Sequence, residues 1–385
     1  MHISLLKSFA LVISFIILSV SMTACSTFFD KDNTPTPSPL VNFTPQIKPT
    51  YQWSKSVGGN KDSDYLKIGP AVNATAIYTA NSSGIVTSLD KSGNQLWRMS
   101  TKLPFSTSPG IGDDIVVVGS RKGEVIALEQ STGKERWRKT LSGEILATPA
   151  IKNGTVIIKA VNGYVWALSA TTGAERWSFQ QVEPNLVLRG ASAPIIQENH
   201  VLVGFANGNL AKLNMADGQL SWMQAVATPT GAFSIQRMID VDADPIVYEH
   251  RIYAATYQGK ITAMDWVLGK FLWSHDISSY TGMVADRNMV YITDAQGNVW
   301  AFNAYTGAVN WRQQKLSARI LTGPVLMGNY VVVGDAQGYL HWLDKRDGHF
   351  VARESIGSAM YAAPVVQDNE LFALTNSGKL AAYTN

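Results

Sequence analysis

From residue 51 onward, short apolar runs alternate with polar turns in one repeated pattern. Each copy begins with a turn glycine and passes through alternating apolar residues and a polar position. It then reaches a second glycine, with a tryptophan four residues later, as in "GEVIALEQSTGKERW" from Gly123. Six copies are complete; a seventh, from Gly338, has Ala352 in place of the tryptophan, and an eighth, from Gly378, lacks its second half.

The content of each period indicates the architecture. Successive first glycines lie about forty residues apart, a period typical of solenoids, propellers and arrays. Each period holds four short β-like runs, for example "APIIQ", "HVLVGFA", "NLAKLN" and "QLSWMQ" around Gly208, separated by Gly, Asn and Asp turns. We therefore predict an all-β fold, an eight-bladed β-propeller with four-stranded antiparallel blades. Seven blades are the alternative, if two weakly marked copies merge.

The incomplete eighth copy needs an outer strand from elsewhere in the chain. The run "YQWSKSV" at residue 51 is β-like and carries a tryptophan, so we expect this N-terminal strand to complete the last blade and close the ring. Because the tryptophans share one phase in the repeat, we expect them to pack between blades, with the indole N–H donating to a loop carbonyl. They are Trp53, Trp97, Trp137, Trp177, Trp222, Trp273 and Trp311.

The first 50 residues have a different character. Residues 1–24 carry Lys7, an apolar run and then small residues, a pattern typical of a secretory signal peptide. The stretch "SMTAC" is similar to a bacterial lipobox, which predicts a lipidated (palmitate-bearing) Cys25; the alternative is an ordinary signal peptide with an incidental cysteine. By similarity to enterobacterial lipoproteins, Ser26 implies an anchor in the outer membrane, at its periplasmic face.

Five prolines lie between residues 26 and 50, among Thr, Ser and Asn. This composition predicts an extended tether of roughly 3.1 Å per residue, or about 75 Å at full stretch. We therefore expect a signal peptide over residues 1–24, a lipidated cysteine and tether over 25–50, and the propeller domain over 51–385.

Composition and motifs exclude several functions. The formal charge is only +3 and the basic residues are scattered, so no basic stripe for nucleic acid is present. The six histidines show no metal-ligand spacing, and the chain has no P-loop, no GxSxG and no HExxH motif. We identify no catalytic, cofactor-binding or metal-ligating residue.

The stretch "QRMIDVDADP" places Asp240, Asp242 and Asp244 on alternate positions, which first indicates a calcium loop. Pro245 stands where such a loop requires glycine, and Arg251 stands where it requires a bidentate glutamate. We therefore reject the calcium interpretation. A pair of catalytic carboxylates is also disfavoured, because no partner acid, base or pocket signal accompanies them.

Two connections are longer than the repeat requires, the ones between Trp177 and Gly208 and between Trp222 and Gly259. Both join the outer strand of one blade to the inner strand of the next, so we expect them side by side on one face. We predict that they form a protein interface, because apolar anchors with Arg and paired acids are typical of one. The alternative is that Arg189 pairs with an acid to order the loops. The residues concerned are Leu186, Leu188, Arg189, Phe233, Arg237, Met238, Asp240 and Asp242.

The repeats resemble those of the pyrroloquinoline-quinone dehydrogenases, which provide an enzymatic alternative. The alcohol-oxidising members of that family commonly place a vicinal Cys–Cys disulfide on the cofactor and a calcium ion beside a catalytic Asp. Cys25 is the only cysteine of this chain, so that disulfide cannot form.

The more distinctive stretches "LVLRGASAP", "IDVDADP" and "VVVGDAQGYLHWLDKRDG" resemble the BamB family, the propeller lipoproteins of the β-barrel assembly machinery. The resemblance runs from the lipobox to the last strand. It implies a non-enzymatic scaffold, without a cofactor, that supports folding and insertion of outer-membrane proteins. It also implies binding to the periplasmic POTRA region of BamA, and so membership of the assembly complex, through Leu186, Leu188, Arg189, Asp240 and Asp242. Asp244 is not carried over, and no residue specifically supports strand addition by nascent outer-membrane proteins.

Overall fold

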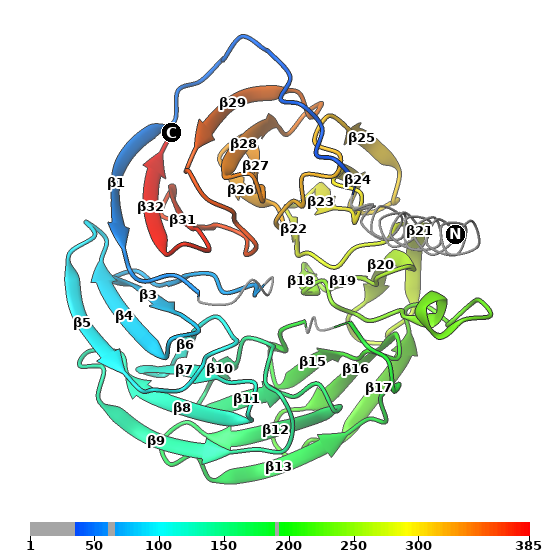
Figure 1. The fold of residues 1–385 in the computed structure, drawn as a ribbon. Coiled ribbons are helices and arrows are strands. Elements are labelled where there is room, and N and C mark those ends of the chain that lie inside the picture. The colour runs from blue at the N-terminus through cyan, green and yellow to red at the C-terminus, as the bar shows by residue number, and fades with distance from the viewer. Residues whose placement is uncertain (1–34, 61–65, 189–191) are drawn as a thin grey trace, which may run out of the picture. The chain divides into compact units, whose positions relative to one another are not determined.

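A computed structural model describes residues 35–60, 66–188 and 192–385. Its strands form eight sheets, each of four antiparallel strands, arranged as blades around a ring (Figure 1). All of them belong to one compact unit, Pro37–Asn385. The predicted all-β propeller of eight four-stranded blades is confirmed, and the alternative of seven blades is wrong.

Each of the first seven blades runs from its inner to its outer strand in chain order. Blades 1 and 2 are β2 (Ala71–Val72), β3 (Ala76–Ala80), β4 (Ile85–Asp90), β5 (Gln95–Ser100) and β6 (Gly110–Gly112), β7 (Ile115–Gly119), β8 (Glu124–Glu129), β9 (Glu135–Thr140). Blades 3 and 4 are β10 (Ala150–Lys152), β11 (Thr155–Lys159), β12 (Tyr164–Ser169), β13 (Glu175–Gln180) and β14 (Ile195–Gln197), β15 (His200–Gly204), β16 (Asn209–Asn214), β17 (Leu220–Ala225).

The remaining elements follow the same order, with one short 3-10 helix, η1 (Ser234–Arg237), between blades 4 and 5. Blades 5 and 6 are β18 (Ile246–Tyr248), β19 (Arg251–Ala255), β20 (Lys260–Asp265), β21 (Phe271–Asp276) and β22 (Met283–Ala285), β23 (Met289–Thr293), β24 (Val299–Asn303), β25 (Val309–Gln313). Blades 7 and 8 are β26 (Val325–Met327), β27 (Tyr330–Gly334), β28 (Tyr339–Asp344), β29 (Phe350–Ser355) and β30 (Val365–Gln367), β31 (Glu370–Leu374), β32 (Lys379–Thr384), β1 (Thr50–Ser56).

The ring is closed by the two ends of the domain. β1 pairs with β32 in antiparallel register from Thr50 opposite Thr384 to Ser56 opposite Lys379. β1 is therefore the outer strand of blade 8, as the sequence predicts, and the pairing removes the free edge that an open array would leave.

The hydrophobic core lies between blades rather than at the centre of the ring. Each of the eight blade interfaces holds its own cluster of buried apolar side chains. Between blades 2 and 3, for example, Val117 and Val125 pack with Val156 and Ile158. The apolar residues at consecutive strand positions are buried because each sheet is covered on both faces by its neighbours.

The repeated tryptophans join neighbouring blades. Six indole N–H groups donate to a backbone carbonyl of the next blade, such as Trp137 Nε1 to Ala170 O at 2.9 Å. Among the described residues, Trp222 Nε1 has no such partner. Each indole also covers the second glycine of the following repeat so closely that an added Cβ would come within 2.9 Å of the ring. The pairs are Trp53–Gly93, Trp97–Gly133, Trp137–Gly173, Trp177–Gly218, Trp222–Gly269, Trp273–Gly307 and Trp311–Gly348.

The missing tryptophan of the seventh repeat has a topological reason. Ala352 lies on β29, and the blade that follows is blade 8, whose two outermost strands are β32 and β1. Those strands come from opposite ends of the domain, so no hairpin turn joins them and no turn glycine is present for an indole to cover. Ala352 is instead buried beside Trp342 and Tyr383.

The N-terminal segment differs from the expected free tether. The compact unit of the ring begins at Pro37, and residues 38–47 make backbone hydrogen bonds to Ser317 and Val351 of blades 6 and 7. The signal peptide predicted for residues 1–24 and the lipidated Cys25 lie outside the described residues. Within the described ranges, no helix has the length and apolar character needed to cross a bilayer.

Candidate functional site

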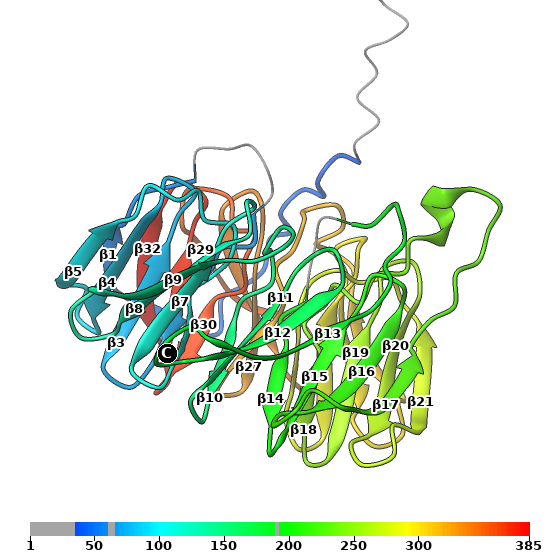
Figure 2. The same cartoon turned by 90° about the horizontal axis from the view of Figure 1, so that it is seen from below.

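Two long interblade loops form the candidate site. Residues 181–194 connect β13 to β14, and residues 226–245 connect β17 to β18. Both connections emerge on the same face of the ring, where η1 marks the tip of the second loop (Figure 2). The neighbouring position expected for these loops is therefore observed.

Two carboxylates of the second loop hold the first loop in place. Asp240 Oδ2 accepts a hydrogen bond from the backbone N–H of Leu188. Asp244 Oδ1 accepts one from the N–H of Ala193 at 2.7 Å. These two bonds enclose residues 189–191, which the structure does not describe, so the pairing of Arg189 with Asp240 or Asp242 remains a prediction.

The structure differs from the expectation that Asp240 and Asp242 face outward, because their exposed fractions are only 1% and 5%. The residues between and beside them, Ile239, Val241 and Ala243, are also buried. Alternate residues point to opposite sides of an extended segment, so burial of all five means that both sides of this segment are covered.

Blades 4 and 5 provide that cover. The N–H of Val241 donates to Phe205 O at 3.1 Å, and the carbonyl of Asp240 accepts from Tyr257 N at 3.0 Å. Gly204 makes room for Val241, since an added Cβ there would lie 2.5 Å from its side chain. The segment is thus inserted between two blades, and its carboxylates act inside the protein.

Burial changes the proton affinity of these carboxyl groups. It raises the pKa of Asp240 to about 7, and the neighbouring carboxylate of Asp242 adds to the rise. It raises the pKa of Asp242 to about 6 against the lowering effect of Lys67 and Lys159. The pKa of Lys159 is lowered by its own burial. Burial therefore shifts these groups toward their neutral forms, and they act within the fold rather than as charges offered to a partner.

Both loops expose apolar side chains. Leu186 is 47% exposed, Phe233 67% and Ile235 60%, while Leu188 and Met238 are half-buried. We call these five residues the docking patch. Ile235 was missed by the sequence analysis, although "AFSIQR" carries it two residues after Phe233 in a segment that the repeat does not need.

The tip of the second loop is shaped by its own polar side chains. Gln236 Oε1 accepts hydrogen bonds from the N–H groups of Ala232 and Phe233, which fixes the turn before η1. Arg237 Nε donates to the carbonyl of Gly231 at 3.1 Å. Arg237 therefore stabilises this loop locally.

A cavity of about 340 Å³ lies at the inner ends of the blades. Each blade contributes residues that precede its innermost strand, among them Ser108, Thr148 and Gly282. Lys67 and the carboxyl groups of Asp242 and Asp244 also line it. Across the described ranges, no group of three His, Cys, Asp or Glu side chains is placed to hold a metal ion.

The chain matches the family model described as "Outer membrane protein assembly factor BamB" over residues 82–313 and 311–385. It is 43% identical to the outer membrane protein assembly factor BamB of Legionella pneumophila (strain Paris) over 372 residues. That alignment covers 95% of this chain and 97% of the relative.

Solved structures agree with this match. BamB from Moraxella catarrhalis superposes with a TM-score of 0.82 at 29% identity, covering 88% of this chain and 100% of that one. Quinohemoprotein alcohol dehydrogenase from Comamonas testosteroni has a TM-score of 0.71 at 15% identity, covering 87% of this chain and 76% of that one, which shows a shared fold alone. With its repeats, its closed ring of eight blades and these similarities, the chain belongs to the BamB family of outer membrane protein assembly factors.

Proposed function

We propose that this protein is a non-enzymatic scaffold lipoprotein that takes part in outer-membrane protein assembly and docks on the periplasmic POTRA region of BamA. The observation that carries the proposal is the docking patch, in which Leu186 and Phe233 stand exposed on two loops joined by hydrogen bonds. Exposed apolar side chains on a rigid support are typical of residues that dominate a protein interface.

The family resemblance implies five partner-binding residues, and the burial of Asp240 and Asp242 divides these five into two groups. Leu186, Leu188 and Arg189 are proposed to contact the partner directly. Asp240 and Asp242 are proposed to act from within, because the hydrogen bond from Leu188 N–H to Asp240 fixes the loop that carries those contacts. Loss of either acid would then weaken docking by loosening the loop.

A membrane anchor completes the proposal. Lipidation of Cys25 would attach the chain to the periplasmic face of the outer membrane, since two or more acyl chains give a stable anchor. The partner region and the docking patch would then occupy the same compartment.

The docking proposal is tested by affinity purification of BamA from solubilised outer membranes. Leu186→Glu and Phe233→Glu each place a charge in the docking patch, and we expect each to reduce recovered BamA at least tenfold, which corresponds to roughly 1.4 kcal/mol of binding free energy.

Leu96→Glu is the matched control, because Leu96 is an exposed leucine, 56% accessible, on β5 of blade 1 and far from both loops in the ring (Figure 1). Its BamA recovery should equal that of the unaltered protein. Undiminished recovery with both patch variants, at unchanged melting temperatures, would refute docking through this patch.

A further inference from the structure

A buried cluster of charged side chains on blades 6 and 7 plays no part in the docking patch. Asp335 and His341 are fully buried and Arg319 nearly so. Asp335 and His341 belong to the stretch "VVVGDAQGYLHWLDKRDG", and blade 7 lies across the ring from blades 3 and 4 (Figure 1). Burying charge is costly unless each group is paired and hydrogen-bonded, so such a cluster calls for a function.

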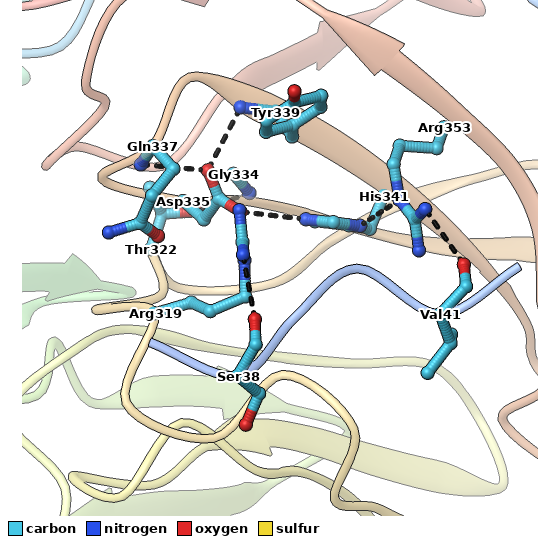
Figure 3. Close-up of polar contacts among 10 residues, drawn as sticks. All are labelled: Ser38, Val41, Arg319, Thr322, Gly334, Asp335, Gln337, Tyr339, His341 and Arg353. Atoms are coloured by element: carbon cyan, nitrogen blue, oxygen red, sulfur yellow. Dashed lines mark hydrogen bonds and ion pairs between the residues drawn. The ribbon is translucent and has the colours of Figure 1, made fainter. Parts of the chain in front are cut away.

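Asp335 organises the cluster (Figure 3). Its Oδ2 accepts a hydrogen bond from Arg319 Nε at 2.7 Å and lies 2.9 Å from His341 Nε2. Its Oδ1 accepts the backbone N–H groups of Gln337 and Tyr339. These four contacts hold the carboxylate ionised and lower its pKa.

His341 connects Asp335 to a second arginine, Arg353. Arg353 Nε donates to His341 Nδ1 at 3.2 Å, so Nδ1 must be unprotonated and Nε2 must carry the hydrogen that is donated to Asp335. Burial lowers the pKa of His341, in keeping with a neutral ring. Among the described residues, no carboxylate accepts a hydrogen bond from Arg353. The other N–H groups of its guanidinium therefore need other acceptors.

The N-terminal segment supplies those acceptors. Arg319 Nη1 donates to Ser38 O at 2.9 Å, and Arg353 Nη1 donates to Val41 O at 3.0 Å (Figure 3). Phe43 stacks on Phe350 of β29 at 5.5 Å between ring centroids, and the Arg353 guanidinium lies over both rings. Without this segment, both arginines would lose a backbone acceptor and Arg353 would lose one of its aromatic faces.

The same segment also pairs with the outer edge of blade 7. The N–H of Gln46 donates to the carbonyl of Val351 on β29 at 2.9 Å, and Ile47 packs against the cluster between blades 7 and 8. The two arginines bind the start of the segment, the strand edge binds its end, and Phe43 fills the space between. We call residues 38–47 the strap.

We propose that Arg319 and Arg353, oriented by Asp335 and His341, form a built-in docking site for the strap. The site fixes the point on blade 7 at which the N-terminal part of the chain leaves the ring. Where the lipid anchor of the proposed function is present, only residues 26–37 then separate it from the strap. The reach of the tether falls from about 75 Å to roughly 37 Å at 3.1 Å per residue.

Hydrogen exchange of the purified full-length protein in detergent tests the docking site. In the unaltered protein, we expect the amide groups of Ser38 and Gln46 to be protected, because both donate to carbonyls of the ring. Arg353→Met and Phe43→Ser should each speed their exchange at least tenfold while strand amides of the blades keep their rates.

Arg138→Met is the matched control, because Arg138 lies on the outer strand of blade 2 and, within the part of the chain that the structure describes, its side chain hydrogen-bonds to Glu135 alone. It should leave strap exchange unchanged. If Arg353→Met speeds exchange throughout the ring, the Phe43→Ser variant decides, since Phe43 lies outside the blades. Unprotected strap amides in the unaltered protein, or protection that survives Phe43→Ser, would overturn the proposal.

The same samples test the docking site for the strap and the proposed lipid anchor independently. The mass of the N-terminal peptide reports whether Cys25 carries acyl chains. An unmodified Cys25 with a protected strap would refute the anchor and keep the docking site, whereas a lipidated Cys25 with an unprotected strap would do the reverse.

Discussion

At Asp240, burial and the neighbouring carboxylate of Asp242 both raise the pKa of the carboxyl group. The folded pKa of about 7 lies above the ordinary value of 3.8 for an unfolded aspartate, so between these pH values the folded protein binds a proton that the unfolded chain does not. The stabilising contribution of this proton is present at low pH and is lost as the pH rises through about 7.

Asp240→Asn should therefore be stabilising at high pH. The amide keeps an oxygen for the N–H of Leu188 and does not ionise, so we expect a melting temperature roughly 2 to 5 °C higher than that of the unaltered protein at pH 8. The increase should be smaller at pH 5, where the folded Asp240 is still protonated. Differential scanning calorimetry at both pH values measures this. A lower melting temperature at pH 8 would instead indicate a cationic partner for Asp240.

Asp335→Asn should change the melting temperature at pH 8 in the opposite direction to Asp240→Asn. Burial would raise the pKa of Asp335, but hydrogen bonds from His341, the Tyr339 N–H and Arg319 outweigh it and lower the pKa. Its contribution is present above the unfolded pKa and is lost as the pH falls through the folded one. The amide should lower the melting temperature at pH 8, so two equivalent substitutions of buried acids should shift it in opposite directions.

The direction in which Asp240 points could not be predicted from the sequence. The surplus length of the loop located the site, and it correctly identified Leu186 and Phe233 as exposed apolar residues. In a loop, however, alternation does not reveal which side is solvated. The burial of Asp240 depends on a gap between two blades that only the assembled ring creates.

Seven of the eight outer strands contact the next blade through one tryptophan that packs on one glycine. Gly173 has φ of +69°, a conformation that disfavours side chains, and an added Cβ would lie 2.8 Å from the indole of Trp137. Gly154 has a similar φ of +73°, but its nearest neighbour would be the far end of Arg176 at 3.6 Å. Alanine substitutions at these two glycines therefore distinguish the free-energy cost of the backbone conformation from the cost of packing against the indole.

We predict that Gly154→Ala lowers the free energy of unfolding by about 1 kcal/mol, from the left-handed backbone conformation alone. Gly173→Ala should lower it by roughly 2 to 4 kcal/mol, because the indole must also move out of its packed position. Urea unfolding followed by tryptophan fluorescence compares the variants. Equal losses would show that the indole contact adds no strain.

At the scale of elements, the strands were predictable because the repeat shows them many times over. The turn glycines and the tryptophan phase together identify the outer strand of each blade, even where Ala352 replaces the tryptophan. The strap was not predictable in this way. Its sequence is not repeated, and its prolines favour an extended chain whether it is free or bound.

For the whole molecule, the proposed anchor at Cys25 would decide where the ring resides. We predict that Cys25→Ala leaves the protein in the soluble periplasmic fraction, because the acyl chains would be lost while the ring itself presents no described helix able to span a bilayer. Fractionation of cells with and without detergent measures this. Detergent-dependent release of the Cys25→Ala protein would contradict lipid anchoring.

The pairing of β1 with β32 also sets the order in which the molecule can be completed. A chain released N-terminus first presents β1 early, yet the partner of Thr50 is Thr384. Until that last strand arrives, β1 has an unpaired edge and blade 8 lacks its outer strand. Such an edge can pair with foreign strands, and a contact between residues so far apart in sequence forms slowly. The newly released chain is thus most vulnerable to aggregation immediately before its final residues appear.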